Sequence, residues 1–202
     1  MISKRSVPAP RKFRGVTRLM HTSKTREDSR AQDPLLIRFR SHPTSSEIKM
    51  AFEHEVELDV SAAAIWLAFR DQNTILPKLL PEAIASIEVV EGEGAPGTTR
   101  LIKLGSVSPD SGYVKEKLVS IDLENRIVVT EEVEGGHLVQ FGFTKWVQTL
   151  KLISTGENTS TVHVTAEFEG GSEENIAKSN EVTKHGLTGT FKALEQYVKS
   201  SS

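Results

Sequence analysis

The sequence predicts an α+β domain in which a curved antiparallel sheet packs around a long C-terminal helix. After residue 50, apolar and polar residues alternate with the period of two that is typical of strands. The segments between these strands are too short for the crossovers that parallel strands need. From Ser172 onward the apolar period becomes helical. An arrangement of this kind leaves a hollow between sheet and helix.

The domain is predicted to begin with a strand and two short helices. Apolar residues alternate with acidic residues over residues 52–60, which predicts a strand with an acidic outer face. Ser61 can cap a helix over residues 62–69. A second short helix is predicted over residues 74–80, interrupted by Pro77.

Six further strands and one helix complete the domain. The strands are predicted over residues 84–91, 99–104, 113–121, 126–134, 138–153 and 161–168. One stripe of the C-terminal helix is formed by Ile176, Thr183, Leu187, Phe191, Leu194 and Val198.

Charge divides the chain into two parts. Residues 1–46 hold eleven Lys and Arg against three acidic residues, a net charge of +8, so the rest carries −10 of the total of −2. We therefore expect a basic leader over residues 1–49 and a folded domain over residues 50–202. The leader has the composition of a transit peptide, but a disordered basic tail and upstream sequence from a wrong start codon are equal alternatives. The expected compartment is the cytoplasm, together with the nucleus, or a plastid or mitochondrion if the leader is a transit peptide.

Composition excludes several classes of function. The chain has no Cys, so disulfides, thiol nucleophiles and Cys-ligated zinc are excluded. No apolar stretch approaches the roughly 20 residues of a membrane span. The six His residues lack metal-ligand spacing, and the basic leader lacks a nucleic-acid-binding motif, so we expect no metal, no cofactor and no specific nucleic acid partner.

Gly92, Gly94 and Gly97 match the dinucleotide-binding pattern G-x-G-x-x-G. That site requires a helix after the glycines, whereas residues 99–104 read as a strand. The acidic residues Glu91 and Glu93 would also repel a pyrophosphate. The segment therefore predicts a glycine-rich turn.

Glu116 is the residue with the clearest chemical claim. It shares a strand face with Val114 and Leu118, while Lys115 and Lys117 face the other way. A carboxylate on an apolar face could transfer a proton or bind a ligand hydroxyl or amine. It could equally pair with another polar group in the cavity or lie at a wet rim.

The motif EGEGAPGT at residues 91–98 resembles the glycine-rich loop of the Bet v I family, a START-like family that includes the class-ten pathogenesis-related and major latex proteins of plants. LPKLLPE, GYVKEKLVSID, EGGHL and ALEQYV follow the family's order around it, and the resemblance covers residues 50–200. It implies the helix-grip fold, a seven-stranded antiparallel sheet with two short helices wrapped on a long C-terminal helix. It also implies an apolar cavity for phytohormones, flavonoids or alkaloid precursors, in a monomer or weak dimer.

Two branches of the family make sharper claims. The sequence is similar to norcoclaurine synthases at Glu116, but their Tyr, Lys and Asp positions fall on Val114, Val128 and Gln148, so their proton relay cannot be carried over. The abscisic acid receptors carry two sequence motifs, a gate and a latch. The corresponding segments of this chain read SVSPDSG and EGGHLVQ, which match neither motif. Abscisic acid signalling through a protein phosphatase partner is nevertheless kept as a further alternative.

The leading hypothesis is a plant defence or hormone-type protein that carries a hydrophobic ligand in its cavity. The expected lining residues are Val56, Leu58, Ile102, Val114, Glu116, Leu118, Trp146, Gln148, Leu187 and Phe191. The competing hypothesis is a cyclase or isomerase that uses Glu116 as its acid or base.

Overall fold

The computed structural model describes residues 50–107 and 112–201. The predicted leader and most of the segment compared with the gate lie outside the described residues. The strands are β1 (Met50–Leu58), β2 (Ile84–Glu91), β3 (Thr99–Leu104), β4 (Tyr113–Asp122), β5 (Ile127–Gly135), β6 (Phe143–Ser154) and β7 (Ser160–Gly170). The helices are α1 (Ala62–Arg70), α2 (Gln72–Leu79), α3 (Gly136–Gln140) and α4 (Glu173–Ser200).

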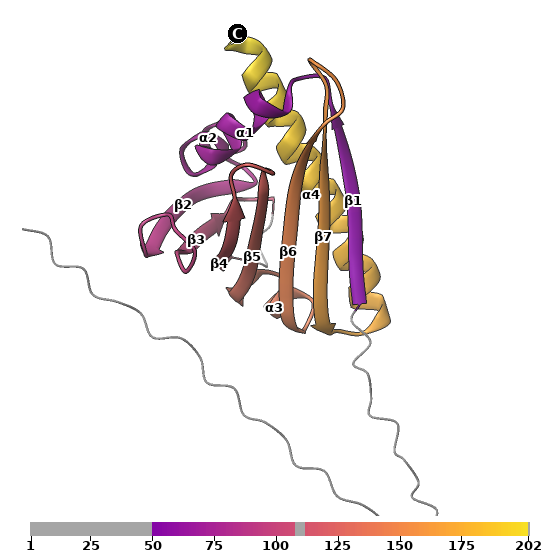
Figure 1. Cartoon of the computed structure of the whole chain (residues 1–202). Coiled ribbons are helices and arrows are strands. Elements are labelled where there is room, and N and C mark those ends of the chain that lie inside the picture. Colours follow the sequence, from indigo (N-terminus) through magenta and orange to yellow (C-terminus); the bar gives the residue numbers. More distant parts are fainter. Residues whose placement is uncertain (1–49, 108–111, 202) are drawn as a thin grey trace, which may run out of the picture. The chain divides into compact units, whose positions relative to one another are not determined.

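The seven strands form one antiparallel sheet in the order β1-β7-β6-β5-β4-β3-β2. Strands β2 to β7 follow one another as a meander. Strand β1 lies at the edge of the sheet, where it pairs with β7 along its whole length. Figure 1 shows α4 running along one face of the sheet, behind β1, β6 and β7, with α1 and α2 near its C-terminal end. The predicted α+β helix-grip fold is confirmed.

Alternation along β7 explains how the sheet and α4 hold together. Val162, Val164 and Phe168 are fully buried, and they belong to the apolar clusters on the face of the sheet that α4 covers. Phe191 and Leu194 of α4 belong to the same apolar cluster as Val162 and Val164. The helix is therefore fixed on the sheet by contacts of high sequence separation.

The second short helix differs from its prediction. It begins at Gln72 and continues past Pro77, which lies inside it. Proline removes one backbone donor. The last turn still closes, because the N–H of Leu80 donates to the carbonyl of Leu76 at 2.8 Å.

The strand predicted over residues 138–153 was wrong in its first part, because α3 occupies Gly136–Gln140 and β6 begins only at Phe143. Gly135 (φ 77°) and Gly136 (φ 47°) turn the chain with positive φ angles. The carboxylate of Glu132 then accepts the backbone N–H of His137 at 2.8 Å. This bond satisfies a donor at the start of the helical turn.

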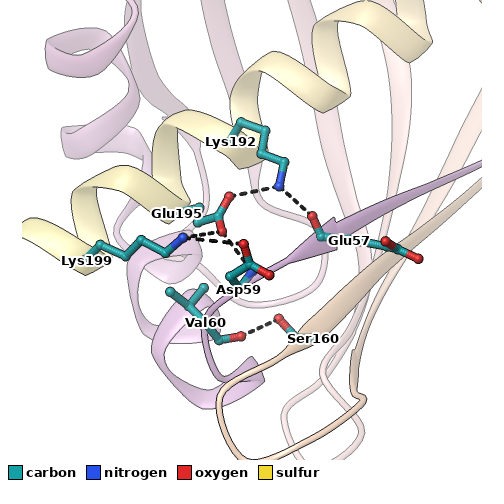
Figure 2. Close-up of polar contacts among 7 residues, drawn as sticks. All are labelled: Glu57, Asp59, Val60, Ser160, Lys192, Glu195 and Lys199. Atoms are coloured by element: carbon teal, nitrogen blue, oxygen red, sulfur yellow. Dashed lines mark hydrogen bonds and ion pairs between the residues drawn. The ribbon is translucent and has the colours of Figure 1, made fainter.

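Both ends of α4 are fixed by polar contacts. At its start, the Ser172 hydroxyl accepts the N–H of Asn175 at 3.2 Å, as a helix N-cap does. Near its end, the buried carboxylate of Glu195 accepts the backbone N–H of Asp59, just after β1 (Figure 2). Lys192 and Lys199 donate to the same carboxylate. These contacts fix the end of α4 to the end of β1.

Candidate functional site

An inner cavity of about 140 Å³ lies between the sheet and the helices. Its walls come from α1, α2, α4 and the strands β2 to β6. The apolar lining residues are Phe69, Leu76, Ile84, Ile87, Ile102, Val128, Leu150, Leu187 and Phe191. The polar lining residues are Gln72, Arg100, Glu116, Thr130, Gln148 and Thr190.

A second, larger cavity of about 340 Å³ lies beside the first, and the exposed side chains of Val89 and Leu123 line it. It is bordered by Trp66 and Arg70 of α1, by Asn73 of α2 and by Gly94 of the glycine-rich segment. Phe69, Gln72, Arg100 and Val128 line both cavities. We call these the inner and outer cavities, and their shared residues mark the junction between them.

Arg100 and Glu116 form an ion pair at this junction. The two residues are direct cross-strand partners in β3 and β4. One guanidinium nitrogen of Arg100 donates to the Glu116 carboxylate, and another donates to the Asn73 side chain at 2.8 Å. The side chains are only 18% and 15% exposed, so both charges are largely removed from solvent. Glu116 is therefore not a lone acid in an apolar wall, because a cation neutralises it.

Six of the ten predicted lining residues line one of the two cavities, and four do not. Ile102, Glu116, Gln148, Leu187 and Phe191 line the inner cavity, and Leu118 lines the outer cavity. The others lie elsewhere. Val56 and Leu58 belong to the main apolar core, Trp146 belongs to a second aromatic cluster, and Val114 lies beside Gly136 of α3.

The sequence analysis did not identify Arg100, which lines both cavities and forms the ion pair with Glu116. The signal was present, because Arg100 is two residues before Ile102 and therefore shares its strand face. Asn73 carried no such signal, since its contact with Arg100 depends on how α2 lies against the sheet.

The glycine-rich segment forms a turn that borders the outer cavity. Gly92, Gly94 and Gly97 have φ angles of 86°, 93° and 99°. Glycine adopts this left-handed region without steric cost. The buried Thr98 closes the turn, because its hydroxyl accepts the N–H of Gly94 at 2.8 Å. A strand follows and no helix, so the dinucleotide pattern lacks the context that it requires.

A second polar group lies at α3, apart from both cavities. His137 Nδ1 lies 2.6 Å from Glu132 Oε1, and His137 Nε2 lies 2.9 Å from the Thr183 hydroxyl on α4. The imidazole stacks on Trp146, with ring centroids 3.9 Å apart and planes 3° apart. These contacts connect β5, α3 and α4, and they have a structural role.

Within residues 50–107 and 112–201, no group of three or more His, Asp or Glu side chains could hold a metal ion. No helix in that part of the chain is long and apolar enough to cross a membrane.

Comparison with known proteins gives one family and many relatives. The model of the pathogenesis-related protein Bet v 1 family matches residues 47–201. A norbelladine synthase from Narcissus pseudonarcissus is 33% identical over 124 residues, which cover 60% of this chain and 76% of the relative. The major strawberry allergen Fra a 1-C from Fragaria ananassa is 33% identical over 154 residues, which cover 73% and 92%.

Solved structures of the same fold are also similar. The norcoclaurine synthase from Thalictrum flavum, in complex with dopamine and hydroxybenzaldehyde, matches with a TM-score of 0.63 and 24% identity. That match covers 77% of this chain and 89% of the enzyme. The structure of Ara h 8.0201 matches with a TM-score of 0.62 and 29% identity, over 75% of this chain and 98% of that one.

Proposed function

Because the chain belongs to the pathogenesis-related protein Bet v 1 family, we propose that it binds a hydrophobic small molecule in the inner cavity, with entry through the outer one. The observation that carries this proposal is the composition of the cavity wall. Apolar residues form most of it, and six polar side chains converge on it from four strands and two helices. Small-molecule sites have this composition, in which apolar contact supplies affinity and polar groups fix orientation.

Three apolar side chains are placed to hold the ligand. Ile102 contributes from the sheet, and Leu187 and Phe191 contribute from α4 on the other side of the cavity. Glu116 and Gln148 supply acceptors and donors at the strand side. A flat, mostly apolar molecule with one polar end suits this arrangement, as phytohormones, flavonoids and alkaloid precursors do. The corresponding role is that of a plant defence or hormone-type carrier.

A neutral fluorescent dye, N-phenyl-1-naphthylamine, tests this proposal. We expect saturable binding by the full chain, and competition by the true ligand. Thr190→Phe puts a ring into the inner cavity from α4, so it should strongly weaken dye binding. Val182→Phe is the matched control, because it adds a ring to an exposed position of the same helix. Equal dye affinity in the two variants, with both folded by circular dichroism, would contradict the proposed site.

An enzyme of the norcoclaurine synthase type is the second candidate. It is supported by the place of Glu116 in the inner cavity and by the similarity to a norbelladine synthase. Val114 and Val128 stand where that mechanism would need a Tyr and a Lys. Glu116 is also the only acidic residue among the described residues that line the two cavities, and its carboxylate is already paired with Arg100.

Incubation with dopamine and hydroxybenzaldehyde, followed by mass spectrometry of the products, separates the two functions. We expect no condensation product above the background reaction. Product formation that is lost in Glu116→Gln would support the enzyme and contradict a purely carrying role.

Inhibition of a protein phosphatase is not part of this proposal. The gate and latch sequences of the abscisic acid receptors are replaced here. The latch segment EGGHLVQ forms the end of β5 and then α3, and His137 of α3 is hydrogen-bonded to Thr183 of α4. A phosphatase assay with and without the chain and abscisic acid would show inhibition if this view is wrong.

A further inference from the structure

We propose that the cavities select hydrophobic ligands that carry an anionic group, and that Arg100 is the residue that binds this group. The inference rests on the proposed binding function and names its ligand class. Arg100 lines both cavities, so its guanidinium lies where a ligand passes from the outer to the inner one. A ligand with its apolar part in the inner cavity would place a terminal charged group near this side chain.

The charges around the outer cavity favour an anion. Its charged lining residues, within the described part of the chain, are Arg70 and Arg100. Glu116 lines only the inner cavity and not the outer one. Glu93, the neighbour of Gly94, is exposed and lines neither cavity. The two cavities together thus carry one positive charge in excess, although the chain after residue 46 carries −10. A cleft of one sign within low-dielectric walls concentrates ligands of the opposite sign.

The guanidinium of Arg100 can hold a ligand without giving up its present contacts. It has five N–H groups in a planar fork, and such forks bind carboxylate and sulfonate groups in a bidentate manner. One of these groups donates to Asn73 and one to Glu116. These two contacts also hold the side chain in position between α2 and β4, so part of its rotamer entropy is already lost before a ligand binds.

A cationic ligand would meet the opposite situation. Its ammonium group would have to pair with Glu116, which already accepts from Arg100. It would also pass Arg70 and Arg100 at close range, where like charges repel. The structure therefore favours hydrophobic acids over hydrophobic amines.

Two dyes with one ring system test this inference. N-phenyl-1-naphthylamine is neutral, and 8-anilinonaphthalene-1-sulfonate carries a permanent negative charge on the same rings. We would measure both dissociation constants for the full chain and for three variants, Glu116→Gln, Arg100→Gln/Glu116→Gln and Lys103→Gln. The double variant removes both partners of the ion pair, so it leaves no buried charge unpaired. Lys103→Gln is the matched control, because it removes one positive charge from the outer face of the same strand, where Lys103 pairs with exposed Glu88.

The measured quantity is the ratio of the neutral to the anionic dissociation constant. We expect the ratio to be highest in Glu116→Gln, intermediate in the natural sequence and Lys103→Gln, and lowest in the double variant. Glu116→Gln should exceed the double variant by about tenfold, since a hydrogen bond to a charged group contributes about 1.5 kcal/mol or more. Equal ratios, or the reverse order, would overturn the role of Arg100. Failure of the neutral dye to bind any variant would instead contradict the proposed binding function itself.

Discussion

The carboxylate of Glu195, near the end of α4, accepts the backbone N–H of Asp59 at 2.8 Å. The Glu195 side chain is 2% exposed, and Lys199 and Lys192 donate to it at 2.8 and 2.9 Å (Figure 2). Burial alone would raise the pKa of Glu195, but the bonds from Lys199, Lys192 and the Asp59 amide outweigh it and hold that pKa at about 2. This contact positions the helix that supplies one wall of the inner cavity.

Substitution of Glu195 should therefore destabilise the domain. Glu195→Gln keeps the size of the side chain but removes the charge that three donors bind, so we expect the free energy of unfolding to fall by about 2 kcal/mol. Urea denaturation of the full chain would measure this change. Glu181→Gln is the control on the same helix, because its contact with Lys184 is long and exposed. A loss of similar size in both variants would contradict a special role of the buried carboxylate.

The same carboxylate predicts how stability depends on pH. The pKa of Glu195 is lower in the folded chain, at about 2, than the ordinary value of 4.5 that it takes when unfolded. Its contribution to stability is thus complete above pH 4.5 and is lost as the pH falls toward 2. The stability difference between the natural sequence and Glu195→Gln should shrink over this range. Urea denaturation midpoints of both proteins, measured in steps of pH over this range, test the prediction. A stability difference that stays constant with pH would contradict it.

The contact between His137 and Thr183 predicts a second effect on stability. His137→Phe keeps an aromatic ring against Trp146 but leaves Glu132 and the Thr183 hydroxyl without the imidazole. We expect a loss of about 1 to 3 kcal/mol, the usual cost of leaving a buried polar group unsatisfied. Combining this change with Thr183→Val in a double-mutant cycle would isolate the α3–α4 contact. A coupling energy near zero would show that the two residues act independently.

The sheet could be predicted from the sequence because its signal is local and repeats along each strand. Residues 84–91 and 99–104 were predicted with the bounds that the structure gives them. The turn at α3 could not be predicted in this way, since Leu138 and Val139 continue the apolar pattern of the following strand. Its helical conformation depends on the carboxylate of Glu132, five residues before His137.

The candidate site was harder to predict because its polar contacts join distant segments. The phase of β4 placed Glu116 on the inner face, but its partner Arg100 comes from another strand and is held by Asn73 of α2. Glu195 was missed for a related reason, because an apolar stripe on a helix says nothing about an acidic residue buried beside it. Its burial follows from the position of β1 against the helix end.

Replacing serine with alanine should have opposite effects at two positions, Ser179 within α4 and Ser172 at its N-cap. Ser179 is fully buried, and its hydroxyl oxygen has no hydrogen-bond partner within the described residues. Ser179→Ala removes this unsatisfied group and improves helix propensity, so we expect a gain of about 0.5 to 1 kcal/mol in the free energy of unfolding. Ser172→Ala removes the N-cap bond to Asn175 and should cost about 1 kcal/mol. Urea denaturation of both variants gives the two signs, and a destabilised Ser179→Ala would indicate that a bound water satisfies that hydroxyl.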